Sequence, residues 1–395
     1  MKIRGIEVYK NVQKKLSVHV PDDFNFHFSF DYTPKVDMFG NNPNIYRTIR
    51  FKDPSRSDSL VHESRISKGT FTTAYRRWFT NWKIEAYDGE ENLIWDLNFE
   101  DHIRGQKLMV CLDSSSLGDT LAWLPVVDLF RKKFSAEVYV TTFWNELSKD
   151  FFPDLKFHPP GFRHPDARAI FGIGWYEEED RNIHKRDPRE ISLQQVAGDI
   201  LGITLSGDAL PPEIPYWLKD SQRSISQKYV CLATESTANA KHWHYPEGWQ
   251  KTVDHLKSLG YEVVVIHSQD NTLEGVIDKT GNRDILTRLV DLYHADFFIG
   301  IGSGLSWLAW ALRKPVVMIS GFSLPLCEFK NLNYRIINSS VCHGCFNDVK
   351  HKFDRGDWNW CPRLKNTERI FECSTKITAD QVISKIDLLI LEQEL

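Results

Sequence analysis

Four cysteines near the C-terminus have a spacing that could bind a single metal ion. Cys342, Cys345, Cys361 and Cys373 follow the pattern C-x2-C-x15-C-x11-C. Four thiolates in tetrahedral geometry suit either Zn²⁺ or iron, and the sequence does not choose between the two. Two disulfides are the alternative, although thiols stay free or bind metal in a reducing compartment. We therefore predict a structural metal-binding finger at residues 336–376.

Asp119 is a candidate general base. It lies in the loop SSSLGDTLAWLP (114–125), which joins a buried strand to a helix and in which Gly118 allows a tight turn. Ligands of open α/β sheets bind at the carboxyl ends of strands, so Asp119 is expected to face an interlobe cleft. The alternative is that Asp119 only caps its helix, because Asp is a favoured N-cap residue. Asp113 is a second candidate base, but its position next to the strand favours a role in holding the loop.

A glycine-rich loop later in the chain could bind a diphosphate. In GIGSGLSWLAWALRKP (300–315), Gly302, Ser303 and Gly304 precede a predicted helix. Small residues there would expose backbone N–H groups at the positive end of that helix. The spacing is not that of a dinucleotide-binding motif, and a plain tight turn explains the same glycines.

The segment ATESTANAKHWHYPEGW (233–249) is a second candidate for phosphate binding. Thr234 could donate a hydrogen bond to a phosphate oxygen, and Lys241 offers a compact positive charge for a leaving diphosphate. A solvated lysine is the simpler explanation of Lys241. Trp243 and Tyr245 could cover a base or a sugar.

Alternating strands and helices must position these loops. From Lys107 onward the chain alternates apolar strands with helical patterns, stops at the proline-rich segment LPPEIPYWLKDSQRS, and then resumes the alternation from KYVCLATES. Such βαβ units specify parallel sheets covered by helices. The fold class predicted is α/β, of the GT-B type, with two Rossmann-like lobes on either side of a cleft.

The first hundred residues have a different pattern of polar and apolar residues. Short runs such as FNFHFSF (25–31) and WKIEAY (82–87) alternate polar and aromatic residues, which is typical of antiparallel hairpins. Their aromatic side chains could form a packed core or, in part, a surface for another chain. The predicted regions are a β-rich domain at 1–104, lobes at 105–218 and 219–335, the finger at 336–376 and a terminal helix at 377–395.

Composition excludes several classes of protein. There are 49 Lys and Arg against 53 Asp and Glu, a formal charge of −4, and no long run of like charges, so no nucleic-acid partner is expected. The start lacks a signal-peptide pattern and the apolar runs are broken by charges, which predicts a cytoplasmic protein with no membrane span. Cys111 and Cys231 sit in apolar runs and are expected to be inert core thiols.

Taken together, SLGDTLAWLP, STANAKHW, GSGLSWLAWALRKPVVMISGF and the four cysteines resemble the bacterial autotransporter heptosyltransferases. The resemblance implies inverting transfer of heptose from ADP-heptose to serine hydroxyls of an autotransporter adhesin. It implies that Asp119 is the catalytic base and that Lys241 binds the donor phosphates. It also implies iron in the finger and assembly into a dodecamer. The nucleotide-sugar pocket would be lined by Thr234, Gly302, Ser303, Gly304 and Ser306.

Two alternative functions remain open from the sequence. A heptosyltransferase acting on lipopolysaccharide core would use the same donor, although the cysteine insert and the β-rich domain argue against it. A catalytically silent sugar-nucleotide-binding scaffold would use the finger and the aromatic strands for assembly. The presence of both Asp119 and Lys241 favours an enzyme.

Overall fold

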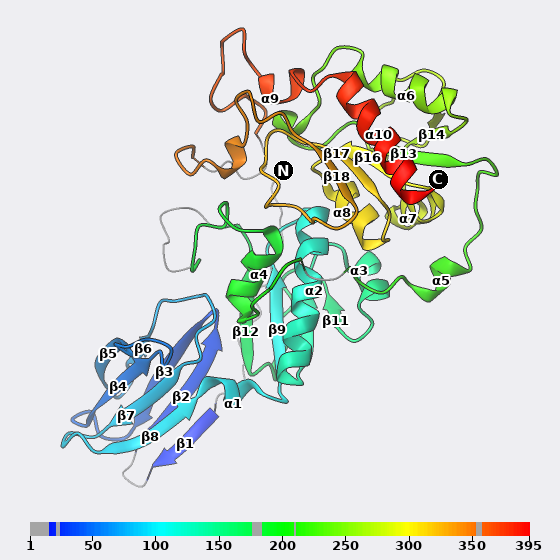
Figure 1. Cartoon of the computed structure of the whole chain (residues 1–395). Coiled ribbons are helices and arrows are strands. Elements are labelled where there is room, and N and C mark those ends of the chain that lie inside the picture. Colours follow the sequence, from blue (N-terminus) through cyan, green and yellow to red (C-terminus); the bar gives the residue numbers. More distant parts are fainter. Residues whose placement is uncertain (1–15, 21–23, 176–183, 209–210, 353–357) are drawn as a thin grey trace.

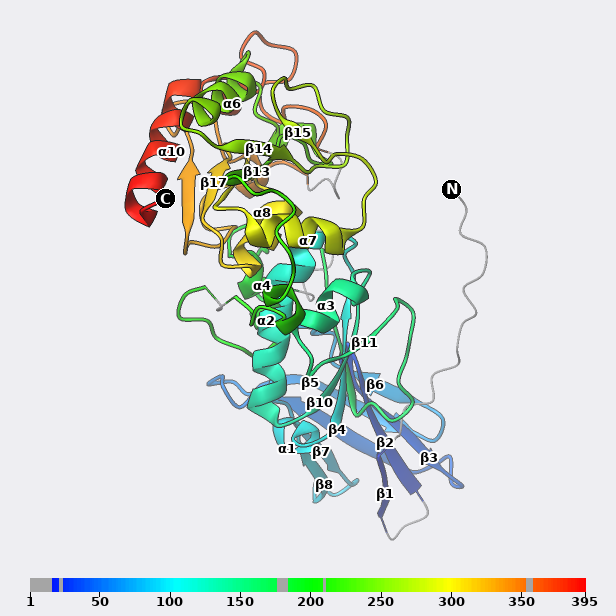
Figure 2. The ribbon, with the colours of Figure 1, turned by 90° about the vertical axis from the view of Figure 1, so that its right-hand side faces the viewer.

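The computed structural model describes residues 16–20, 24–175, 184–208, 211–352 and 358–395. The N-terminal strands, a first α/β lobe and a second α/β lobe follow one another along the long axis of the molecule (Figure 1). The same order is seen in the perpendicular view, in which the C-terminal helix lies on the outer side of the second lobe (Figure 2). Within the described residues, no helix combines the length and the apolar character needed to cross a membrane.

The N-terminal strands are built on a period of two. In β2 the side chains of Phe26, Phe28 and Phe30 are buried, and the residues between them are partly exposed. Successive side chains of a strand point to opposite faces, so this pattern gives β2 one aromatic face. Phe99 packs there, with its ring centroid 4.5 Å from that of Phe30. These aromatic residues therefore form a core. The elements are β1 Leu16–Val20, β2 Phe24–Asp31, β3 Thr33–Gly40, β4 Tyr46–Lys52, β5 Leu60–Ser67, β6 Phe71–Thr73, β7 Lys83–Tyr87, β8 Leu93–Asn98 and α1 Phe99–Ile103.

An eight-stranded sheet joins these strands to the first lobe. Its order is β11-β10-β9-β12-β2-β3-β6, with β1 paired to β2, while β5-β4-β7-β8 form a separate antiparallel sheet. Strands β9 to β12 are parallel, and β12 pairs with β2 where Ile170 lies opposite Asp31. The sheet thus continues across residue 104, the expected domain boundary. The first lobe contains β9 Lys107–Leu112, α2 Leu117–Phe134, β10 Glu137–Thr141, α3 Asn145–Phe151, β11 Lys156–His158, β12 Ala169–Ile173 and α4 Leu193–Leu201.

Local signals set the ends of the first lobe's helices. The hydroxyl of Ser116 accepts a hydrogen bond from the Asp119 backbone N–H and caps α2, which ends at Ser135 in the left-handed conformation. Ser192 caps α4 in the same way, and Gly202 ends that helix. Helix α2 is buried along most of its length because it packs against both α4 and α8.

The second lobe is a six-stranded parallel sheet in the order β15-β14-β13-β16-β17-β18. Its strands are apolar on both faces: Val230 and Leu232 belong to one core, with α6 and α10, while Cys231 and Ala233 belong to the other, with α7 and α8. The two lobes confirm the predicted GT-B-like architecture. The lobe and the linker before it contain α5 Tyr216–Lys219, β13 Tyr229–Ala233, η1 Asn239–Lys241, α6 Gly248–Ser258, β14 Glu262–Val265, β15 Ile277–Asp278, α7 Ile285–His294, β16 Phe298–Ile301, α8 Gly304–Ala311, β17 Val316–Ile319 and β18 Asn333–Ile336.

The C-terminal segment has little regular structure until its last helix. It contains the 3-10 turn η2 Cys345–Asn347, the short helix α9 Glu372–Thr375 and the helix α10 Ala379–Gln393. A capping box between Thr378 and Gln381 begins α10, as the sequence pattern predicts for a packing helix.

Candidate active site

Asp119 does not cap its helix. Ser116 is the N-cap of α2, and Asp119 lies one turn further on with a half-buried side chain. Its Oδ2 accepts hydrogen bonds from the hydroxyl of Ser114 at 2.5 Å and from the indole N–H of Trp175 at 2.8 Å. The Ser114 hydroxyl also accepts a hydrogen bond from the backbone N–H of Ser116 at 3.1 Å. In a capping box, this N–H of Ser116 would instead donate to the Asp119 carboxylate. The carboxylate is therefore held by its own set of donors.

The environment of Asp119 favours proton acceptance. Burial raises the pKa of the carboxyl above its ordinary value, because the charged form loses solvation. The hydrogen bonds from Ser114 and Trp175 and the positive charge of Lys241 act in the opposite direction on the same pKa. A carboxylate with a raised pKa is a stronger base than a solvated one. Lys241 belongs to the second lobe.

Lys241 ends the 3-10 turn η1 in the loop that follows β13. The backbone of this loop is fixed from behind: Ala240 is buried and its N–H donates to the carbonyl of Trp358 at 2.9 Å. The imidazole of His242 lies 3.2 Å from the backbone N–H of Ser236 and 3.2 Å from Glu235, which ties the two ends of the loop together. The ammonium group of Lys241 is thus carried by an ordered loop at the mouth of the second lobe.

The N-termini of α2 and α8 meet at the junction of the lobes. A Cβ placed on Gly304 would lie 2.9 Å from the Cβ of Leu117, and one on Gly118 would lie 3.2 Å from the side chain of Trp307. Real Cβ atoms do not approach other atoms as closely as 2.9 Å, so glycine at 304 is required for this contact. The glycines of both predicted loops therefore allow the start of α2, which carries Asp119, and the start of α8 to approach each other.

The residues predicted to line the nucleotide-sugar pocket differ in whether their side-chain hydroxyl already has a hydrogen-bond partner. The Ser303 Oγ is buried, makes no cap hydrogen bond to α8, and has no partner among the described residues. Ser306 is buried and its hydroxyl donates to the carbonyl of Ile301 at 2.6 Å, which favours a structural role. Gly302 leaves room beside Glu328, whose Oε1 would lie 3.0 Å from an added Cβ.

Thr234 is paired with a residue that the sequence analysis did not single out. Its hydroxyl lies 3.1 Å from Nε2 of His267, which follows β14 and is buried. Burial lowers the pKa of His267, so the imidazole is neutral near pH 7. His267 could have been found from the sequence, because it follows the carboxyl end of a predicted parallel strand, where ligands bind.

One expectation about the side chains beside these loops was wrong. Trp243 does not cover a ligand: it is only 4% exposed and its indole N–H donates to the carbonyl of Ile377 at 2.8 Å. Cys111 is buried as expected, yet its thiol lies 3.6 Å from the guanidinium of Arg163 in a cavity wall. Cys231 is fully buried, as predicted.

The four C-terminal cysteines gather in one region without forming an assembled metal site. Cys342 and Cys345 belong to one small cluster, and the Gly344 N–H between them donates to the carbonyl of Gly321, which lies against Cys373. Burial raises the pKa values of Cys345 and Cys373 to about 12. Across the described ranges, no group of three or more His, Cys, Asp or Glu side chains is arranged to hold a metal ion. The metal-binding finger therefore stays a prediction. None of the described cysteines forms a disulfide.

The cysteine segment supports the Lys241 loop. Cys345 and Trp358 share a small core with Ala238 and Ala240. The backbone N–H of Asn239 lies 3.4 Å from the side-chain oxygen of Asn359, in addition to the bond between Ala240 and Trp358. A disturbance of the segment is therefore expected to reach the loop.

Comparison with known protein families supports a transferase. Residues 216–353 match the model of glycosyltransferase family 9 (heptosyltransferase). This match covers the second lobe and the start of the cysteine segment, which includes the candidate donor loops.

Three relatives match over most of their length. The autotransporter heptosyltransferase TibC of Escherichia coli O78:H11 (strain H10407 / ETEC) is 35% identical, over 85% of this chain and 85% of its own. The autotransporter heptosyltransferase BAHTCr of Citrobacter rodentium (strain ICC168) is 36% identical, over 85% and 84%. The inactive autotransporter heptosyltransferase BimC of Burkholderia thailandensis (strain ATCC 700388 / DSM 13276 / CCUG 48851 / CIP 106301 / E264) is 29% identical, over 85% and 80%.

The fold is also that of a solved relative. The crystal structure of the dodecameric iron-containing heptosyltransferase TibC in complex with ADP-D-β-D-heptose superposes with a TM-score of 0.85 at 31% identity. The match covers 96% of this chain and 99% of that one. It includes the N-terminal strands, both lobes and the cysteine segment.

Proposed function

The chain belongs to the autotransporter heptosyltransferases of glycosyltransferase family 9 and is a heptosyltransferase, and we propose that it transfers heptose from ADP-heptose to serine hydroxyls of an autotransporter adhesin. The donor is the sugar nucleotide bound by TibC, and the acceptor class is suggested by the names of the relatives. Modification before export requires the enzyme to act in the cytoplasm. The observation that carries the proposal is that Asp119, held by Ser114 and Trp175, lies near the start of α2, where this helix meets the start of α8 of the second lobe.

The proposed reaction is a single displacement. The serine oxygen attacks the anomeric carbon of the heptose while the bond from that carbon to the diphosphate oxygen breaks, which inverts the anomeric configuration. Asp119 accepts the serine proton, and ADP leaves with the bonding electron pair. Positioned proton transfer of this kind contributes roughly 10²–10⁴-fold to the rate.

The second lobe would bind the donor. Lys241 would stabilise the negative charge that develops on the leaving diphosphate. The buried hydroxyl of Ser303 needs an acceptor, because buried polar groups are rarely left unpaired, and a phosphate or ribose oxygen would supply one. Gly302 and Gly304 would let the donor approach the start of α8, while Thr234 would orient it beside His267.

The test is to incubate the purified chain with ADP-heptose and an unglycosylated autotransporter passenger fragment, and to measure the mass of the intact fragment. We expect additions of one heptose each, with the wild-type chain and not with Asp119→Asn. Transfer only to lipopolysaccharide core would favour the sugar-modifying alternative. Donor binding without any transfer would favour a scaffold, an outcome that the inactive relative BimC makes worth testing.

We further infer that Cys342, Cys345, Cys361 and Cys373 hold one structural metal ion, iron as in TibC, with zinc as the alternative. Four neighbouring thiols are a suitable donor set for either ion. The ion would cross-link the segment and take no part in the transfer. Elemental analysis of the purified chain should find about one iron per chain, lost in Cys361→Ser. Zinc alone would refute iron, and the absence of both metals would refute the site.

The similarity to dodecameric TibC leads us to propose that this chain also forms a homo-oligomer of twelve subunits. Light scattering coupled to size-exclusion chromatography measures the mass directly. A chain that elutes as a monomer at all concentrations would contradict the proposal.

A further inference from the structure

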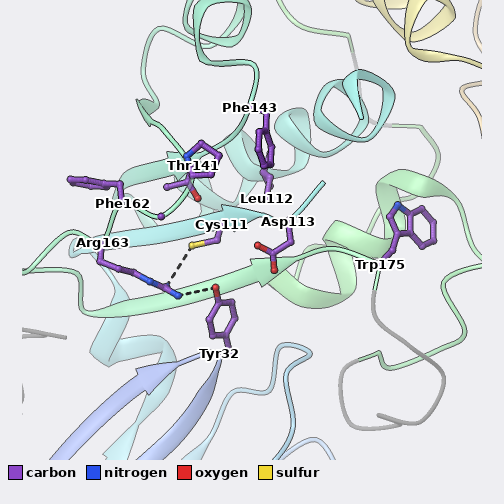
Figure 3. Close-up of a pocket in the computed structure, with 11 residues that line it drawn as sticks. Tyr32, Cys111, Leu112, Asp113, Thr141, Phe143, Phe162, Arg163 and Trp175 are labelled. Atoms are coloured by element: carbon purple, nitrogen blue, oxygen red, sulfur yellow. Dashed lines mark hydrogen bonds between the residues drawn. The ribbon is translucent and has the colours of Figure 1, made fainter. Parts of the chain in front are cut away.

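A cavity of about 440 Å³ opens in the first lobe (Figure 3). Its walls come from the segments that follow β9, β10, β11 and β12, that is, from the carboxyl ends of four neighbouring parallel strands, and from the turn between β2 and β3. Ligands of open α/β sheets bind at such strand ends, and the volume is within the range of about 300–1,000 Å³ found for ligand sites. The lining residues used below are Tyr32, Cys111, Asp113, Phe143, Arg163 and Trp175.

The cavity is connected to the candidate base through one side chain. Trp175 lines the cavity and donates its indole N–H to the Asp119 carboxylate at 2.8 Å. A molecule seated against Trp175 would therefore lie next to Asp119. All lining residues precede residue 176, whereas Lys241 and α8 belong to the second lobe. The cavity is thus formed by the first lobe, whereas the residues suited to the donor diphosphate belong to the second.

Arg163 is held in a way that leaves it able to bind a ligand. Its guanidinium donates to the hydroxyl of Tyr32 at 3.1 Å and to the thiol of Cys111 at 3.6 Å, as Figure 3 shows. A thiol sulfur is a weak acceptor, so exchanging it for a peptide carbonyl oxygen would gain a stronger hydrogen bond. The same Nη1 of Arg163 that donates to Cys111 also lies 3.6 Å from the carboxylate of Asp31.

The position of Tyr32 is determined by the joint between the two parts of the sheet. Its backbone has a φ of 60°, which is uncommon for a bulky residue, and its N–H donates to the carbonyl of Ile170 at 2.8 Å. Residues in such conformations persist where the surrounding structure fixes them, often at binding sites. The sheet that joins the N-terminal strands to the first lobe therefore places a phenol in the cavity.

The charges and the rim of the cavity suit a neutral polar chain. The lining carries one guanidinium, Arg163, and one carboxylate, Asp113, so it has no excess of positive charge for a polyanionic sugar acceptor. Phe143 is 57% exposed at the rim, where it can pack on a bound chain. An extended polypeptide offers carbonyl oxygens for Arg163 and aliphatic atoms for Phe143.

We propose that this cavity binds the acceptor polypeptide next to the serine that is modified, with Arg163 donating to an acceptor main-chain carbonyl and Phe143 packing on the chain. The inference rests on the proposed function, since it names the subsite that the protein acceptor would occupy. It assigns to the first lobe the selection of protein over sugar acceptors.

The test measures acceptor binding separately from transfer. The dissociation constant of an unglycosylated autotransporter passenger fragment is measured with the full chain in the presence of ADP, for wild type, Arg163→Gln and Phe143→Ala. The acceptor KM and the affinity for ADP-heptose are measured on the same proteins. Phe71→Ala is the matched control, because Phe71 is 55% exposed and lies on β6 outside the cavity.

Each cavity variant should raise the fragment's dissociation constant and KM by about tenfold, with ADP-heptose affinity unchanged, as expected for losing a hydrogen bond from a charged donor or a buried aromatic contact. Phe71→Ala should bind like wild type. If Arg163→Gln fails to fold, Phe143→Ala decides. Unchanged fragment binding in a folded variant, or a loss of donor affinity alone, overturns the proposal. A wild-type chain that binds the fragment through the cavity but transfers no heptose would keep this proposal and refute the proposed function.

Discussion

Replacing Trp175 with phenylalanine should move the pH dependence of heptose transfer to higher pH. The indole N–H donates to the Asp119 carboxylate at 2.8 Å, and this hydrogen bond lowers the Asp119 pKa against the raising effect of burial. Phenylalanine keeps an aromatic ring but removes the donor. The Asp119 pKa of the variant should therefore be higher than that of the wild type.

The size of the shift follows from the energy of one hydrogen bond. A bond to a charged group is worth about 1.5–3 kcal/mol, and one pKa unit corresponds to about 1.4 kcal/mol, so the shift should be about 1–2 units. Asp119 must be ionised to accept a proton, so kcat/KM falls as pH drops through its pKa. The acidic limb of the profile should move upward by that amount in Trp175→Phe, while the rates converge at higher pH.

The assay is the pH profile of kcat/KM for transfer to the passenger fragment. Trp144→Phe is the matched control, because Trp144 is also half-buried and its indole N–H donates at 2.9 Å to the uncharged carbonyl of Ser115. The control should leave the acidic limb in place. An unmoved limb in Trp175→Phe, or equal shifts in both variants, would show that Asp119 is not the titrating base.

Three further predictions concern the same junction. Asp119→Asn should lower kcat by about 10²–10⁴-fold without weakening ADP-heptose binding in calorimetry. It should also raise the melting temperature, because the raised pKa of Asp119 means that the folded state disfavours the charged carboxylate. Ser114→Ala should let the Asp119 carboxylate turn back to cap α2, lowering kcat by at least about tenfold in the transfer assay while thermal stability is kept. Gly304→Ala should destabilise the chain by about 1–3 kcal/mol in urea unfolding, since its Cβ would clash with α2, whereas Gly89→Ala, whose Cβ would meet open space, should not. Full activity in Ser114→Ala, or equal stability of the two glycine variants, would contradict these arguments.

The sequence predicted the elements that depend on local signals. Alternating apolar runs and helical patterns predicted the parallel strands, and the caps of α4, Ser192 and Gly202, are residue types that favour the two ends of a helix. The rule that ligands bind at strand ends predicted that the loops before α2 and α8 face each other, and the starts of these two helices do meet. The pattern Ser116-x-x-Asp119 could also have shown that serine is the cap, because it matches a capping box.

Contacts between distant segments could not be predicted in this way. Strands β12 and β2 pair where Ile170 lies opposite Asp31, and no sequence periodicity encodes this pairing. Two hydrogen bonds depend on that packing: the one from the Trp175 indole N–H to Asp119 and the one from the Arg163 guanidinium to the Tyr32 hydroxyl. Trp243 was misassigned because an aromatic residue beside a ligand loop and one in a core have the same sequence signature.

The cysteine segment contacts both halves of the candidate active site. Its core residues Cys345 and Trp358 lie behind the loop that carries Lys241. On the other side, the ring of Phe346 lies edge-on to Trp175, with centroids 5.8 Å apart, and Trp175 holds Asp119.

The described part of this segment has only two short helical turns before α10, so little backbone hydrogen bonding of its own fixes its shape. A segment of this kind keeps one conformation only if packing or a cross-link supplies the order. Arg189 of the first lobe, which is buried, donates to the carbonyl of His351 at 2.7 Å and supplies part of that packing. The cysteine segment supports Asp119 through Trp175, and it supports Lys241 through the loop that follows β13. The order of the segment therefore affects the geometry between Asp119 and Lys241. A cross-link among the four thiols would therefore act on catalysis without touching either substrate.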